Sequence, residues 1–227
     1  MISSAGSTRQ PGWGSRSIID ESRLIREPVR LALHLPRLLH RTPCPAQIIV
    51  LPGLGANDAS TIPLRCYLRA VGHHVQGWEL GTHQRHVLTT LQQFSRRLGA
   101  AVERTNEPIT LIGWSLGGVI AREAARERPE HVAQVITMGS PINGPGYSST
   151  RRRRPIPVPV TTIYSRRDSV VNWRNALDHD SPTAVNIEVT SSHFGLGLDP
   201  DVWRIIVDTI DHPPPVVSTI AADQAAP

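Results

Sequence analysis

One serine of the sequence stands among glycines, between a short apolar run and a helical pattern. The segment GWSLG spans residues 113–117, follows the apolar residues 109–112, and leads into apolar residues at helical spacing. A strand that turns sharply into a helix strains the central residue, exposes its side chain, and leaves no room for a Cβ on its neighbours. The helix also directs free N–H groups toward developing negative charge. The pattern therefore predicts that Ser115 is a nucleophile, with Gly113 and Gly117 as the glycines of the turn, rather than a structural serine in a glycine-rich loop.

A serine hydroxyl needs a base to accept its proton, and the sequence offers four histidines downstream. They are His131, His179, His193 and His212. His131 begins a strand pattern, and His212 lies beyond the last helical pattern. His193 directly follows an apolar run and precedes that last helix, so it lies in a loop at the carboxyl end of a predicted strand. We predict that His193 is the base.

A carboxylate must orient the imidazole. Where the nucleophilic serine lies in such a strand-to-helix turn, the carboxylate comes after the serine and before the histidine in the chain. Asp168 follows the apolar run 160–164 by a few residues, so it comes from the carboxyl end of a predicted strand. Asp178 and Asp180 are the competing carboxylates, in a segment that has the character of a loop or short helix. The sequence favours Asp168, and geometry must decide.

Acyl transfer also requires N–H donors for the tetrahedral oxyanion. The residue after the nucleophile, Leu116, supplies one such donor. The second is expected from the loop that follows an earlier strand. Here Gly53 permits a tight turn after the apolar run 47–51, and Leu54 carries the next N–H. We predict Leu54 and Leu116 as the two donors.

Strand and helix patterns alternate along the chain, which predicts an α/β fold with a mainly parallel sheet and helices on both faces. The predicted strands cover residues 46–53, 73–78, 108–114, 131–140, 158–165 and 184–191. The predicted helices cover residues 60–72, 84–103, 116–128 and 199–210, the last with Asp199 as N-cap and Pro200 at its first position. Active sites of such sheets lie at the carboxyl ends of the strands.

The remaining segments frame a single domain over residues 19–212. Residues 1–18 are rich in Gly, Ser and Arg and indicate a flexible arm, and residues 213–227 indicate a loose, Pro-rich tail. Residues 19–41 predict one or two short helices, broken at Pro28 and Pro36. Their basic, amphipathic pattern also allows weak contact with a membrane surface.

Composition narrows the function. The formal net charge of +5 allows attraction to anionic surfaces, but the sequence has no nucleic-acid motif, so we expect no nucleic-acid partner. Two cysteines, Cys44 and Cys66, are too few for a zinc site or a disulfide framework, and unlinked thiols are the simpler interpretation. Neither a signal-peptide pattern nor a long apolar run is present, so we expect a cytoplasmic protein.

Four blocks of the sequence resemble the α/β-hydrolase superfamily, and within it the esterase and triacylglycerol-lipase branch. The blocks are residues 50–81, 111–141, 159–173 and 191–203, so the resemblance covers roughly residues 45–211. It implies Ser115 as nucleophile, Asp168 as acid, His193 as base, and Leu54 and Leu116 as oxyanion donors, without a cofactor or catalytic metal. It further implies a small-molecule or lipid-like ester as substrate.

The chain departs from this family's pattern in two places. Many lipases have His-Gly at the oxyanion loop, where this chain has Pro52-Gly53. The family usually inserts a helical lid, where this chain has only a short cap loop, residues 141–158, so we expect a minimal or absent lid and an open site. The cap includes Arg151–Arg154. These arginines either belong to a solvated loop or form a site for an anionic group of the substrate.

The sequence thus predicts a serine carboxylic-ester hydrolase that acts through an acyl-enzyme. Two alternatives remain open. An acyltransferase or thioesterase would use the same three residues, and a non-catalytic binding protein would keep only the fold.

Overall fold

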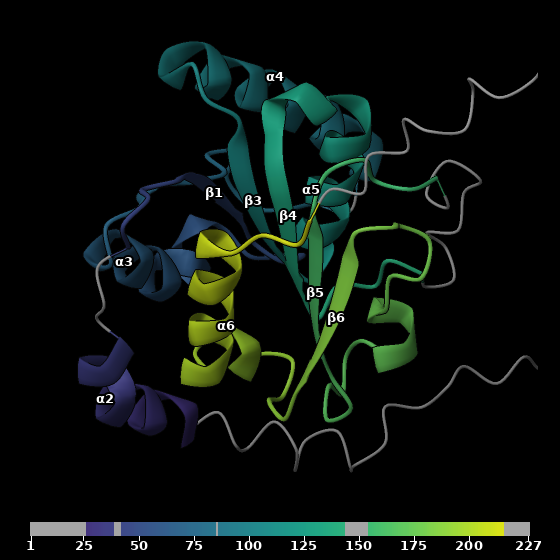
Figure 1. Ribbon diagram of the computed structural model, residues 1–227. Helices are drawn as coiled ribbons and strands as arrows, with labels where there is room; N and C mark the ends of the chain where they lie inside the picture. Colours follow the sequence, from purple (N-terminus) through teal and green to yellow (C-terminus); the bar gives the residue numbers. More distant parts are fainter. Residues whose placement is uncertain (1–25, 39–41, 85, 144–153, 216–227) are drawn as a thin grey trace, which may run out of the picture.

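Six strands form one parallel sheet in the order β2-β1-β3-β4-β5-β6 (Figure 1). The computed structural model describes residues 26–38, 42–84, 86–143 and 154–215. The strands are β1 Gln47–Leu51, β2 His74–Gly77, β3 Ile109–Trp114, β4 Val132–Met138, β5 Val160–Ser165 and β6 Ala184–Val189. Each of the six lies within a predicted strand, and the predicted α/β class is confirmed.

Helices cover both faces of this sheet (Figure 1). They are α3 Ile62–Ala70, α4 Val87–Thr105, α5 Leu116–Glu127 and α6 Pro200–Asp211. Side chains of a strand alternate between its two faces. Accordingly, Ile49 and Leu51 of β1 pack in one core with α4 and α5, and Ile48 and Val50 pack in the other core with α3 and α6. Both faces of the central strands are therefore buried, which explains why β1 and β3 are largely apolar runs in the sequence.

The strand order reverses direction at β1. From β1 the chain crosses to β2 on one side, and it then returns to β3 on the other side of β1. In an open parallel sheet such a reversal leaves a crevice outside the carboxyl ends of the strands. β1 ends at Leu51 and β3 ends at Trp114, so the loop from Pro52 and the junction at Ser115 flank this crevice.

One continuous helix, α2 Arg26–Leu38, precedes the sheet, and the predicted break at Pro28 and Pro36 is wrong. Pro28 lies in the first turn, where an N–H has no partner inside the helix. Pro36 lies in the last turn. The backbone hydrogen bond that it cannot donate is therefore lost only near the end of the helix. Arg30 ties α2 to the start of α6 through an ion pair with Asp201 at 2.9 Å.

α2 leaves two apolar side chains, Val29 and Leu33, exposed. No helix in the described ranges has the length and apolar character needed to cross a membrane. Weak contact of this segment with a membrane surface stays a prediction.

Several expectations fall outside the described residues. These are the arm at residues 1–18, the tail from residue 216 onward, and Arg151–Arg153 of the cap loop. Residues 139–159 connect β4 to β5, and residues 144–153 of this connection lie outside the described residues. The minimal lid therefore stays a prediction. Cys44 and Cys66 are free, exposed thiols.

Candidate active site

Ser115 lies at the junction of β3 and α5 in a strained backbone conformation. Its φ is 53° and its ψ is −121°, a combination that residues with a Cβ rarely adopt. Its N–H donates to the carbonyl of Met138 at 2.8 Å, and its carbonyl accepts from the N–H of Gly118 at 3.1 Å. These two bonds hold the junction in a geometry that the local backbone would not choose.

The glycines beside Ser115 are required by close approach of the backbone. A Cβ on Gly113 would overlap the backbone of Gly118, and a Cβ on Gly117 would lie 2.5 Å from the carbonyl oxygen of Leu51. The predicted glycines of the turn thus occupy positions where only glycine fits. Sequence reasoning gave no role to Gly118, although a Cβ there would overlap the buried side chain of Ser140.

Asp168 and His193 form a buried pair at the carboxyl edge of the sheet. Asp168 follows β5, His193 follows β6, and the carboxylate Oδ2 lies 2.7 Å from Nδ1 of the ring. Their side chains are 2% and 4% exposed. The other carboxylate oxygen accepts hydrogen bonds from the N–H groups of Val170 and Val171 at 2.9 and 2.7 Å. The acid is therefore held by its own loop, and one of its oxygens is left for the histidine.

The end of β4 brings this pair next to the serine. Met138 accepts the hydrogen bond from the Ser115 N–H. The following residue, Gly139, has a φ of +53°, and a Cβ on it would lie 2.9 Å from the Asp168 oxygen and 3.2 Å from the His193 nitrogen. The three predicted residues thus meet around residues 138–139. Within the described residues no hydrogen bond joins the Ser115 hydroxyl to the ring, and such bonds are often long before a substrate binds.

The loop after β1 lies directly beside Ser115 and carries Leu54, one of the two predicted oxyanion donors. A Cβ on Gly53 would lie 3.3 Å from the Cβ of Ser115, so this loop passes directly beside the serine. Leu54 is 44% exposed, and its N–H has no hydrogen-bond partner among the described residues. Leu116 is the first residue of α5, where the helix leaves an N–H without an internal partner.

His83 braces this loop, and sequence reasoning missed it. Its ring Nδ1 lies 2.9 Å from the carbonyl of Pro52, its N–H donates to Ala56, and its carbonyl accepts from Gly55. Burial lowers the pKa of His83, partly opposed by the hydrogen bond to Pro52. No local signal marks this residue, because its partners lie about thirty positions earlier in the chain.

The competing carboxylates have different surroundings. Asp178 is buried and forms an ion pair with Arg122 of α5 at 2.8 Å. Burial raises the pKa of the Asp178 carboxyl, but the Arg122 guanidinium and hydrogen bonds from Ser181 outweigh it and hold that pKa below 3.8. Asp180 is exposed and donates its N–H to Asp178. Neither pairs with a histidine among the described residues, nor do these residues group three His, Cys, Asp or Glu side chains in a way that could hold a metal ion.

Comparison with known proteins identifies the fold. A protein family described as having the alpha/beta hydrolase fold matches residues 103–156 of the sequence. No curated protein matches the sequence.

Several solved structures are similar to this chain. Aspergillus fumigatus lipase B shares 16% identity over 80% of this chain, with a TM-score of 0.64, and the chain spans only 57% of that lipase. Paleococcus ferrophilus monoacylglycerol lipase shares 14% identity over 76% of this chain and 96% of its own, with a TM-score of 0.60. For Bacillus licheniformis lipase BlEst2 in its mature form, identity is 12%, coverage is 75% and 94%, and the TM-score is 0.59.

The parallel sheet, with its strained strand-to-helix junction at the point where the strand order reverses, defines the class of protein. The chain has the α/β-hydrolase fold. The superfamily predicted from the sequence is confirmed.

Proposed function

We propose that the protein is a serine hydrolase that cleaves a carboxylic ester through an acyl-enzyme intermediate. The observation that carries this proposal is the meeting of the strained Ser115 with the buried Asp168–His193 pair around the end of β4. The similarity to lipases supports the choice of an ester, small or lipid-like, as the substrate.

The reaction follows from the placement of these groups. The Ser115 hydroxyl attacks the ester carbonyl and passes its proton to Nε2 of His193. Asp168 accepts the hydrogen bond from Nδ1, so it keeps Nε2 free to accept that proton and stabilises the imidazolium. The ring then protonates the leaving alcohol. Water repeats the sequence to release the acid and restore the serine.

The tetrahedral oxyanion would lie between the N–H groups of Leu54 and Leu116. Neither N–H has a hydrogen-bond partner among the described residues, and Leu54 follows Gly53, which lies beside Ser115, while Leu116 follows Ser115 in the chain. Loss of one such donor typically lowers kcat by about 10²- to 10³-fold. In this chain the donors belong to the backbone, so a substitution removes one only if it introduces proline or shifts the backbone.

Labelling with a fluorophosphonate tests the nucleophile. The intact mass should increase by one adduct in the native chain and remain unchanged in Ser115→Ala, which should keep the native circular dichroism spectrum. A panel of p-nitrophenyl esters from acetate to palmitate would then measure the acyl preference. Turnover by a clean Ser115→Ala preparation, or absence of an adduct on folded native protein, would contradict the proposal.

A further inference from the structure

Trp114 connects the strand that carries the candidate nucleophile to the loop that carries the candidate base. It is the last residue of β3 and directly precedes Ser115. Its indole N–H donates to the backbone carbonyl of His193 at 3.2 Å. Among the described residues, no other hydrogen bond joins residues 113–118 to the loop of residues 190–198. This bond is therefore the direct polar link between the two halves of the site.

The same loop packs against the indole ring of Trp114. A Cβ on Gly197, at the end of the loop, would lie 3.2 Å from the ring atoms Cζ3 and Cη2, so the backbone passes close to the ring. The ring of Phe194 lies edge-on to the indole, with ring centroids 6.5 Å apart, which is a favourable arrangement of two aromatic rings. These contacts restrain the ring and keep its N–H directed at the carbonyl of His193.

The pair of Asp168 and His193 does not by itself set the distance from the base to Ser115. Asp168 follows β5 and His193 follows β6, whereas Ser115 follows β3, and β4 lies between β3 and β5. Among the described residues the Ser115 hydroxyl makes no hydrogen bond to the ring, so the serine does not hold the ring in place. A displacement of about 1 Å between reacting groups can lower a rate by about 10²-fold. A bond from β3 to the loop of His193 is therefore well placed to keep Nε2 within reach of the hydroxyl.

We propose that Trp114 is a positioning residue for the candidate base. Its indole N–H holds the backbone of His193, and through it the ring, at the distance from Ser115 that proton transfer requires. Trp114 itself neither accepts nor releases a proton, because the indole N–H acts only as a donor. The assignment rests on the proposed ester hydrolysis. It explains why β3 ends in tryptophan, since an apolar side chain of similar size would pack against the loop without holding its carbonyl.

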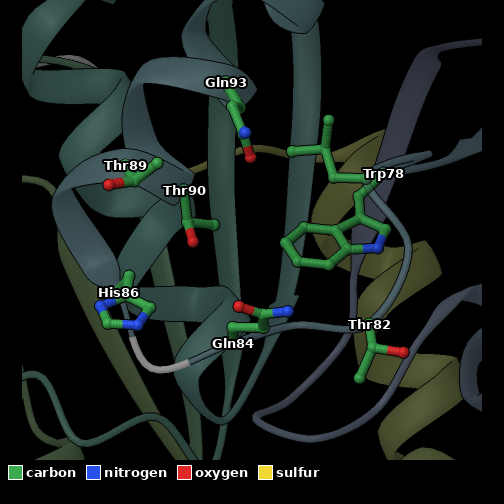
Figure 2. Close-up of a pocket in the computed structure, with 8 residues that line it drawn as sticks. Trp78, Thr82, Gln84, His86, Thr89, Thr90 and Gln93 are labelled. Carbon is green, nitrogen blue, oxygen red and sulfur yellow. The ribbon is translucent and has the colours of Figure 1, made fainter.

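Two other tryptophans make the same type of bond without joining the candidate nucleophile. Trp203 of α6 donates its indole N–H to the carbonyl of Gly197 at 3.0 Å, in the loop that carries His193. Trp78 donates to Gly81 at 2.9 Å, and its ring lines a pocket beside the start of α4 (Figure 2). Trp203 is the matched control, because it holds the same loop from α6 instead of β3.

Replacement by benzothienylalanine tests this bond, because that residue keeps the shape of tryptophan and has sulfur in place of the N–H. In place of Trp114, it should lower kcat for a p-nitrophenyl ester by roughly 3- to 30-fold, with KM little changed. In place of Trp203, it should leave kcat within about twofold of the native value. Urea titration should show a similar loss of stability in both proteins, since each loses one neutral hydrogen bond. An unchanged kcat at position 114, or equal losses of kcat at both positions, would overturn the assignment.

Proton NMR separates failure of this assignment from failure of the proposed function. The Nδ1 proton of His193, shared with Asp168, should give a signal far downfield of the amide protons that is absent in His193→Gln. Replacement of Trp114 should broaden this signal, because a loosened loop admits water to the pair, and replacement of Trp203 should not. A signal that depends on Trp114 in a chain that hydrolyses no ester would refute the hydrolase and keep the positioning of His193. Ester turnover with a rate and a signal that ignore Trp114 would refute the positioning and keep the hydrolase.

Discussion

Two buried aspartates have cationic or basic partners, and they differ in the chemistry of the partner. Asp178 faces Arg122, and its second oxygen, Oδ1, accepts N–H groups of Asp180 and Ser181. In the same way, one oxygen of Asp168 accepts hydrogen bonds from backbone N–H groups, and the other contacts a side chain. The partner of Asp168, however, is a histidine whose second nitrogen remains available for chemistry.

This difference separates a structural pair from a candidate catalytic pair. A guanidinium stays charged throughout the accessible pH range, so the Arg122–Asp178 pair can neither take up nor release a proton near neutrality. An imidazole held through Nδ1 can accept a proton at Nε2 and return it. Burial alone therefore does not distinguish a candidate catalytic acid from a structural one. The identity of the partner side chain makes that distinction.

The largest effect should come from Asp168→Asn. An asparagine can place its amide N–H toward Nδ1, which favours the tautomer with the proton on Nε2 and removes the base. We expect kcat for a p-nitrophenyl ester to fall by roughly 10³- to 10⁴-fold, with little change in the free energy of unfolding. Stopped-flow or long time-course assays measure the rate, and urea titration measures the stability. Full activity of this variant would show that another carboxylate serves as the acid.

The corresponding change at the other aspartate should have the opposite profile. Asp178→Asn leaves the buried Arg122 without its counter-charge, and breaking a buried pair from one side costs about 3–5 kcal/mol. For a chain of this size that lowers Tm by roughly 6–20 °C. The kcat of the folded fraction, measured well below Tm, should stay within about twofold of the native value.

A double variant controls for general disruption. Arg122→Met combined with Asp178→Asn removes both charges, so it should recover part of the lost stability.

The native pair should also weaken in acid. Because the pKa of Asp178 is held below 3.8 in the folded state, its contribution is present above that pH and is lost as the pH falls through the folded pKa. Asp178→Asn should flatten this acid limb, and an unchanged limb would contradict the role of the pair.

The same comparison shows what the sequence could predict. The strands, the helices and the junction at Ser115 follow from local periodicity, glycine spacing and context, and Asp168 and His193 follow from their positions just after strands. The structure agrees with these placements, while the roles of the site residues stay predictions. Arg122 was not predicted, because its partner Asp178 lies 56 positions later and only the packing of α5 brings them together. A helical segment was predicted where α2 lies, but its continuity through Pro28 and Pro36 was not, because the proline rule was applied without regard to position within the helix.

A smaller loss of activity is expected at His83, which holds the predicted oxyanion loop through the carbonyl of Pro52. His83→Leu removes the hydrogen bond to the Pro52 carbonyl and lets the loop shift. We expect kcat to fall by roughly 10- to 100-fold, less than the loss of a whole donor, with KM little changed. His83→Asn can place an amide N–H where Nδ1 stood, and it should recover a substantial part of the rate. Equal losses in both variants would indicate a purely steric role.

The smallest effect concerns the pH dependence of stability that arises from the buried histidines His83 and His73. Burial lowers the pKa of His83, and burial also lowers the pKa of His73, although the charge of Asp211 opposes it there. The unfolded chain takes up protons on these histidines near pH 6.5, whereas the folded chain does so only at lower pH. The unfolded state therefore binds more protons below about pH 6.5, and the free energy of unfolding should decrease as the pH falls through that range. Each histidine contributes at most about 1.4 kcal/mol per pH unit.

Urea unfolding of the native chain at pH 7.5, 6.5 and 5.5 measures this slope. His83→Asn should reduce the slope, because it removes a group that is buried in its neutral form. Equal slopes in the native chain and His83→Asn would mean that the ring accepts a proton in place. The carbonyl of Pro52 would then stabilise a charged histidine as effectively as water does.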